Sequence, residues 1–168
     1  KLVEVLERLL KLEPEDAESR AMLVRVTVER GDFNRALQLM SQLDAELLDT
    51  TVYRLLKAQC LLGIEEAEAA LALLRKIPEA EQDISYDRTF ARTMVAVGQV
   101  QEATRVLQQL VDAGDATVSD LVLYAECLLK QGEEQAAIAP LDHVLKLDAN
   151  HKAASLLMIR ALYTLERL

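Results

Sequence analysis

The sequence predicts an all-α protein, an α-solenoid of antiparallel helix hairpins with about ten helices. The first observation is a column of alanines with spacings of 33 or 34 residues, namely Ala36, Ala70, Ala103 and Ala137. A second column of small and aliphatic residues has the same spacings and comprises Val24, Ala58, Ala91, Ala125 and Ile159. The third observation is a glycine five residues before the alanine in three repeats, at Gly31, Gly98 and Gly132. A period near 34 residues is typical of stacked helix–turn–helix units.

Packing explains this period. Two helices of about 12–14 residues and two short turns fill about 34 residues. One helix pair cannot bury its own apolar stripe, so neighbouring pairs stack and share a continuous core. The small residues are expected where helices cross closely, and we expect enlarging one of them to cost about 1–3 kcal/mol. The glycines are expected at helix ends that need a left-handed backbone.

The helices are predicted from apolar residues at helical spacing, and their ends from the proline, glycine and capping residues between them. The expected helices in order are 1–12, 15–30, 33–43, 50–62, 65–77, 84–97, 100–112, 118–130, 133–147 and 151–165. Pro14 ends the first helix and Pro78 ends the fifth. Gly63 lies two residues before Glu65, which occupies the glycine column, so this turn is expected to be irregular. Gly114 stops a helix and Thr117 is expected to cap the next one.

We expect one continuous solenoid without an interrupting linker. It divides into half repeat 1–14, repeats 15–48, 49–82, 83–116 and 117–150, and half repeat 151–168. Pro140 lies inside a predicted second helix and removes a backbone hydrogen bond to Ala136, so a local kink is expected. The chain begins with Lys1, in the middle of a helix and without an initiator methionine. We therefore interpret it as part of a longer protein, which leaves its compartment open between cytoplasm and periplasm.

The composition supports this fold and disfavours some classes of binding partner. The hydrophobic fraction is 51% and the aromatic fraction only 4%, which is typical of helical cores of Leu, Ala and Val. The net charge of −9 disfavours binding to nucleic acid or to an anionic membrane. No apolar run is long enough to insert into a membrane. Cys60 and Cys127 occupy equivalent places in alternate repeats, so we expect two free, buried thiols.

The turn-plus-alanine signature resembles the tetratricopeptide repeat (TPR). It is carried by Gly31-Asp32-Phe33 with Ala36, by Gly98 with Ala103, by Gly132-Glu133 with Ala137, and by Leu12-Glu13-Pro14. The resemblance covers the whole chain and implies a right-handed superhelix. The repeats are divergent, because the usual aromatic residue near the start of each first helix is replaced by Arg20, Arg54, Asp87 and Leu121.

The resemblance also implies a concave groove that is lined by the first helix of each repeat and accepts an extended peptide or a helix. Carried onto this chain, the groove-lining residues are Arg25, Gln59, Arg88, Arg92, Glu126, Arg160, Leu55, Val122 and Tyr163. The apolar members of this set could instead belong to the ordinary core between repeats. The lysine and asparagine pattern of chaperone-tail binding is absent from these columns.

Arg88 and Arg92 lie four residues apart on one helix face. One interpretation is that they bind a carboxylate of the partner, because the guanidinium group matches carboxylate geometry. The other is that they pair with neighbouring acids of this chain, such as Asp87, Glu102 or Glu126.

Catalysis and metal binding are not expected. No nucleophilic residue accompanies His143 and His151, and their spacing is not that of a metal-ligand pair. The sequence also contains no phosphate-binding loop and no dinucleotide fingerprint. We therefore predict no enzyme activity, no cofactor and no metal.

The expected function is a scaffold that binds a protein or peptide partner in the groove. The alternative is a rigid spacer or assembly arm of a larger bacterial envelope, secretion or polysaccharide-export protein. Self-association is a further expectation, because the half repeats are expected to expose Leu2, Leu6, Leu9, Leu157 and Leu162.

Overall fold

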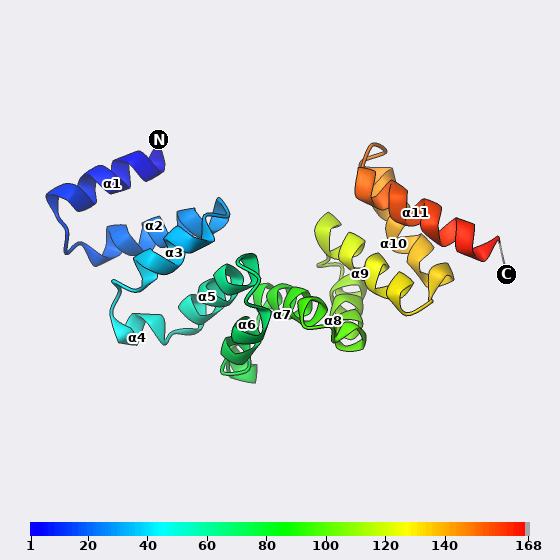
Figure 1. Ribbon diagram of the computed structural model, residues 1–168, viewed down its shortest axis with the longest axis horizontal. Helices are drawn as coiled ribbons and strands as arrows, with labels where there is room; N and C mark the ends of the chain where they lie inside the picture. Colours follow the sequence, from blue (N-terminus) through cyan, green and yellow to red (C-terminus); the bar gives the residue numbers. More distant parts are fainter. Residues whose placement is uncertain (167–168) are drawn as a thin grey trace. The chain divides into compact units, whose positions relative to one another are not determined.

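The computed structural model describes residues 1–166, and these form eleven α-helices and one 3-10 helix without any strand (Figure 1). The prediction of an all-α fold built from helix hairpins is confirmed. The helix beyond the expected ten is α4 (Ala45–Leu48), a single turn in the connection between the first two repeats. No helix of the described residues has the length and apolar character that crossing a membrane requires.

The chain divides into two compact units, Lys1–Gln82 (unit 1) and Asp83–Leu168 (unit 2), and each is described separately. The division falls at the expected boundary between repeats 49–82 and 83–116. The continuity of the array across this boundary stays a prediction.

Unit 1 consists of one helix followed by two helix pairs. Its helices are α1 (Leu2–Leu12), α2 (Ala17–Glu29), α3 (Phe33–Met40), α4, α5 (Thr51–Gly63), α6 (Ala67–Leu74) and the 3-10 helix η1 (Glu79–Glu81). In sequence order, α1 packs on α2, α2 on α3, α3 on α5, and α5 on α6. The main core of this unit consists of Val24, Val28, Ala36, Met40, Leu43, Tyr53 and Cys60.

Unit 2 consists of two helix pairs and a final helix. Its helices are α7 (Ile84–Ala96), α8 (Val100–Ala113), α9 (Val118–Lys130), α10 (Glu134–Leu147) and α11 (Lys152–Leu165). Each helix packs on the next along the chain. The first helices of successive repeats also contact one another, α7 with α9 and α9 with α11. Met94, Leu107, Leu128, Leu141 and Val144 are completely or almost completely buried.

The small-residue columns lie where the helices meet. Val24 and all seven alanines of the two columns have no exposed surface, as expected of residues between packed helices. Ile159 belongs to the same column but is 63% exposed on α11, because no second helix follows α11 among the described residues. Both cysteines are free and buried as expected, and burial raises the pKa of the Cys60 thiol to about 11.

The end helices expose only part of the expected apolar surface. Leu2 and Leu162 are exposed, and Leu9 and Leu157 are half-buried. The expectation for Leu6 is wrong, because it is 5% exposed and forms a small core with Val3 and Leu23.

Pro140 lies inside α10, which continues on both sides of it, and the ring is buried. The expected kink at this residue stays a prediction.

The turns between paired helices have a left-handed backbone, as the glycine column predicts. Gly31, Gly98 and Gly132 have φ angles of 76°, 80° and 77°. Glu65 occupies the same place in the second repeat with φ 66°, which is unfavourable for a residue with a side chain. Gly63 is required for a steric reason instead, because a Cβ atom there would overlap the ring of Phe33.

Replacing Glu65 with glycine is expected to stabilise the protein by about 0.5–1 kcal/mol. The left-handed conformation costs a non-glycine residue about 1–2 kcal/mol, and the greater freedom of glycine in the unfolded chain offsets part of the gain. Urea unfolding should show a higher midpoint with an unchanged m value. The control is Glu68→Gly within α6, which should cost about 1 kcal/mol. A lower midpoint for Glu65→Gly would contradict the assignment of strain to this turn.

Candidate partner-binding site

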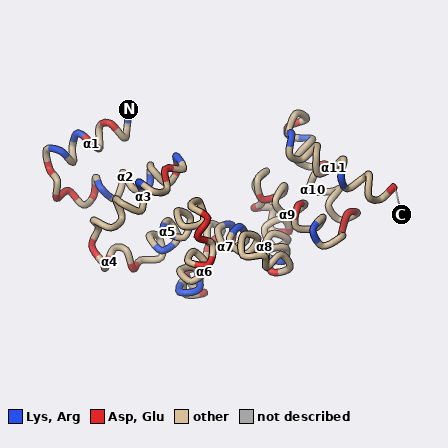
Figure 2. The backbone as a smooth tube through the Cα atoms, in the orientation of Figure 1, with Lys and Arg blue, Asp and Glu red and all other residues tan. Residues whose placement is uncertain are grey.

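The residues predicted to line the groove are distributed over first helices of both units. Arg25, Leu55 and Gln59 belong to unit 1, and Arg88, Arg92, Val122, Glu126, Arg160 and Tyr163 belong to unit 2. Arg25, Arg92, Arg160 and Tyr163 are exposed, and the other five are partly buried. Figure 2 shows basic positions on α7, where Arg88 and Arg92 lie.

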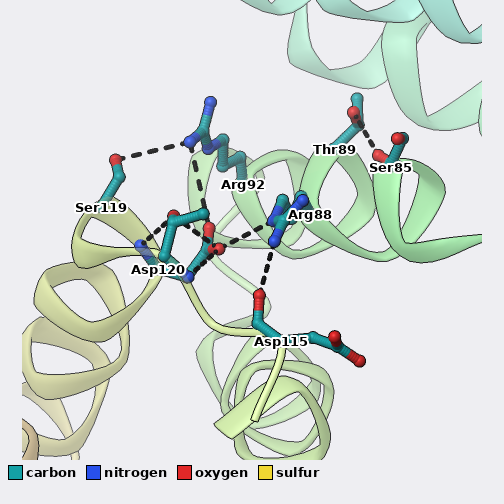
Figure 3. A network of polar contacts seen from close by, with 8 residues as sticks. Ser85, Arg88, Thr89, Arg92, Asp115, Ser119 and Asp120 are labelled. Atoms are coloured by element: carbon teal, nitrogen blue, oxygen red, sulfur yellow. Dashed lines mark hydrogen bonds and ion pairs between the residues drawn. The ribbon is translucent and has the colours of Figure 1, made fainter. Parts of the chain in front are cut away.

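Arg88 is engaged with its own chain. Its Nε donates to Oδ2 of Asp120 at 2.9 Å, and its Nη2 donates to the backbone carbonyl of Asp115 at 2.5 Å (Figure 3). The Asp120 side chain is completely buried, whereas that of Arg88 is 30% exposed. The acids considered as partners from the sequence, Asp87, Glu102 and Glu126, did not include Asp120. Glu126 pairs instead with Lys130 on its own helix at 3.0 Å.

Asp120 also completes the N-terminal cap of α9. The Thr117 backbone N–H and its hydroxyl both donate to Oδ2 of Asp120, at 2.9 and 2.7 Å. The Asp120 backbone N–H donates back to the Thr117 hydroxyl at 3.3 Å, which forms a capping box. The prediction that Thr117 caps this helix is confirmed. One carboxylate therefore holds the start of α9 and ties it to α7.

Arg92 is held more loosely than Arg88. Its Nη2 lies 3.4 Å from the Ser119 hydroxyl and 3.9 Å from Oδ1 of Asp120 (Figure 3). This Oδ1 atom is buried and has no hydrogen-bond partner. The Arg92 side chain is 49% exposed, so its guanidinium group is accessible from outside the network.

The pKa of Asp120 reflects two opposing effects. Burial by itself would raise it, because a low-dielectric environment disfavours the charged form. The hydrogen bonds from Thr117 and the hydrogen bond and charge of Arg88 outweigh burial, so the pKa of Asp120 is lowered below its ordinary value. The carboxylate is therefore charged at neutral pH.

This shift predicts a pH-dependent contribution to stability. Since the folded-state pKa of Asp120 lies below the unfolded value of about 3.9, its contribution is complete above that pH and is lost as pH falls through the folded value. Urea unfolding of wild type and Asp120→Asn should give a constant difference in unfolding free energy between neutral pH and about pH 5. Below about pH 4 the difference should shrink. A difference that grows on acidification would contradict the sign of this shift.

A pocket of about 560 Å³ lies beside this network within unit 2. It is lined by Arg92 of α7, by Val118, Ser119, Val122, Leu123 and Glu126 of α9, and by His151 at the start of α11. The structure thus brings together three predicted residues, Arg92, Val122 and Glu126. The sequence reasoning missed Val118, although it lies four residues before Val122 on the same helix face.

The missed histidine has a defined role at the edge of the pocket. His151 is the N-cap of α11, and its Nδ1 accepts the backbone N–H of Ala154 at 3.2 Å. A neutral histidine that accepts through Nδ1 carries its proton on Nε2, so it offers a hydrogen-bond donor. The sequence did contain a signal for this role, because His151 lies at the start of a predicted helix and polar residues at that position commonly cap the helix.

A recurrent arginine contact distinguishes the first three repeats from the fourth. Arg20, Arg54 and Arg88 each donate to the carbonyl two residues beyond the second helix of their own repeat, namely Gln42, Lys76 and Asp115, at 3.0, 3.1 and 2.5 Å. Such carbonyls lack a partner within the helix and carry partial negative charge. The arginines therefore occupy the surface between the paired helices in three repeats.

The fourth repeat lacks this arginine. The corresponding positions of α9 are Leu121, which is buried, and Val122, which lines the pocket. Unit 1 has pockets of about 550 and 400 Å³, but their linings include Arg54 and Arg20, which are engaged with carbonyls. The position that holds a carbonyl-bound arginine in the first three repeats thus holds an aliphatic residue in α9.

The pocket combines hydrogen-bond donors with aliphatic side chains. Among residues 1–166, no group of three or more His, Cys, Asp or Glu side chains is arranged to hold a metal ion. Arg92, Ser119 and His151 place hydrogen-bond donors around an apolar floor. Such a combination can orient a polar group while it buries an apolar one.

One solved structure agrees with this architecture. The chain is similar to the crystal structure of a thermophilic TPR protein from Thermus thermophilus, with TM-score 0.70, 20% identity, and coverage of 96% of this chain and 89% of that chain. A domain of a protein of unknown function from Vibrio parahaemolyticus matches with TM-score 0.47 and 24% identity over 87% of each chain. The search of curated proteins finds no match.

A family model identifies the chain more directly. The model described as anaphase-promoting complex, cyclosome, subunit 3, whose repeats are of the TPR type, matches residues 2–77 and 97–168. These ranges include both predicted half repeats and most of the helices between them. By this match, together with the fold, the chain belongs to the family described as anaphase-promoting complex, cyclosome, subunit 3.

Proposed function

We propose that this protein is a non-enzymatic scaffold that binds a segment of a protein partner on the first helices of unit 2. The observation that carries the proposal is the pocket between α7, α9 and α11. Its floor is formed by Val118, Val122 and Leu123, and hydrogen-bond donors lie around it. The TPR resemblance, which implies a groove lined by first helices, supports the proposal.

The size of the pocket favours a peptide segment as the occupant. About 560 Å³ lies within the usual range for binding clefts, about 300–1,000 Å³. This volume accepts one or two side chains of a peptide, whose backbone can hydrogen-bond to the surrounding polar groups. The family and fold are shared by repeat scaffolds, in which binding depends on particular surface residues.

The test uses the full chain and a phage-displayed library of random linear peptides. Wild type should enrich binders, and Val122→Glu should weaken them by at least about tenfold, because a carboxylate on the apolar floor must be desolvated. Leu147→Glu is the control, since Leu147 is exposed on α10 and does not line the pocket. Circular dichroism should confirm that both variants fold.

Two outcomes would contradict the proposal. Either no peptide is enriched by wild type, or the enriched peptides bind Val122→Glu as strongly as they bind wild type. A failure of the first kind would favour the alternative of a rigid spacer or assembly arm, which requires contacts at the ends of the array and no occupant of the pocket.

A further inference from the structure

We infer that the partner segment carries an acidic residue directly beside an apolar one, with the carboxylate on Arg92 and the apolar side chain against Val118 and Val122. This inference rests on the proposed function and specifies the chemistry of its partner. It follows from the difference between the two arginines of α7 and from the charge near the start of α9.

The two arginines differ in what remains for a partner to bind. Arg88 uses Nε for Asp120 and Nη2 for the Asp115 carbonyl, and it does not line the pocket. Arg92 lines the pocket, is half exposed, and makes one long hydrogen bond, to Ser119. Its remaining donors suit a carboxylate, which accepts two parallel hydrogen bonds from a guanidinium group.

The local charge favours an acid although the whole chain is acidic. Arg88 and Arg92 surround one buried carboxylate, Asp120, which leaves an excess positive charge at this place. The N-terminus of α9 adds a partial positive charge of about half a unit. The Asp115 carboxylate points away from Arg92 (Figure 3). Glu126, the acid in the lining, is paired with Lys130.

Asp120 also positions Arg92. Its Oδ1 is buried without a hydrogen bond and lies 3.9 Å from Nη2 of Arg92, so the two charges attract. This attraction holds the guanidinium group at the start of α9, beside Val118. A carboxylate that binds the outer side of Arg92 therefore places the neighbouring residue of the partner over the apolar floor.

The experiment analyses the peptides selected by the wild-type chain. Most binders should contain Asp or Glu next to an aliphatic or aromatic residue. For a synthetic peptide of this kind, replacing the acid by its amide should weaken binding to wild type by about tenfold, the effect of one charge-assisted pair. The same change should have little effect on binding to Arg92→Gln. Arg92→Lys should retain part of the discrimination.

The control variant is Arg105→Gln, which removes the same charge from an exposed position of α8 outside the pocket. It should discriminate acid from amide as wild type does. Two results would overturn the inference while the proposed function stands. In the first, Val122→Glu weakens binding but replacing the acid by its amide does not. In the second, replacing the acid by its amide weakens binding to Arg92→Gln as much as it weakens binding to wild type. Absence of any binder would overturn both. Dimerisation that both Val122→Glu and Arg92→Gln abolish would identify a second copy as the occupant and would also overturn it.

Discussion

Replacing Arg88 with methionine is expected to lower the free energy of unfolding by about 3–5 kcal/mol. The substitution retains most of the aliphatic length of the side chain but removes the cation that is hydrogen-bonded to the buried Asp120, leaving only Arg92 at 3.9 Å. The Thr117 hydrogen bonds remain, but they do not replace a full positive charge. Removing the hydrogen-bonded partner of a buried carboxylate is among the largest single penalties that a point substitution causes.

Urea unfolding followed by circular dichroism measures this effect, and a double-mutant cycle assigns it. Arg88→Met combined with Asp120→Asn should cost less than the sum of the two single variants, because the second change removes the buried charge that Arg88 no longer pairs with. Arg105→Met on the surface of α8 is the control and should change stability by about 0.5 kcal/mol or less. Additive effects would show that the ion pair does not act as a unit.

Replacing Met40 with alanine is expected to lower the free energy of unfolding by about 2–5 kcal/mol. Met40 is 2% exposed and lies at the centre of the unit 1 core, among residues of α2, α3 and α5. Truncation removes apolar contacts and leaves a cavity that the surrounding helices fill only in part. Its neighbours Val24 and Ala36 have no exposed surface, so no side chain there is poised to fill the space.

The control is the same substitution at an exposed site. Met22 lies on α2 and is 45% exposed, so Met22→Ala should cost less than about 1 kcal/mol. Hydrogen exchange within α2, α3 and α5 should show faster opening for Met40→Ala and nearly unchanged opening for Met22→Ala. Equal effects of the two variants would show that Met40 is not central to the core.

Much of the fold could be predicted because its signals are local and repeated. The alanine columns recur at one period, so each repeat supports the assignment of the next, and their complete burial confirms it. Gly98 and Gly132 predicted the left-handed turns, and Thr117 predicted the start of α9, since helix ends depend on residues within one turn.

The candidate site could be predicted only in part. The period placed Arg92, Val122 and Glu126 on first helices, and these three do line one pocket. His151 was missed because its place beside α9 depends on how α11 packs. The partner of Arg88 was missed as well, since Asp120 lies 32 residues away on another helix.

The sequence by itself determined the number of helix pairs, their turns and the buried columns, because helical periodicity and capping act between residues close in the chain. Only the tertiary structure decided which side chains pair across helices. Repeat spacing is 34 residues except for one step of 33, and one residue rotates a side chain by about 100° around its helix, so spacing alone does not fix these pairs. Arg54 pairs with the carbonyl beyond its own helix pair and with Asp49, five residues before it, whereas Arg88 pairs with such a carbonyl and with the buried Asp120 of the next repeat. The packing between helices also places Gly63 against the ring of Phe33 and places Val122 in the lining of the pocket.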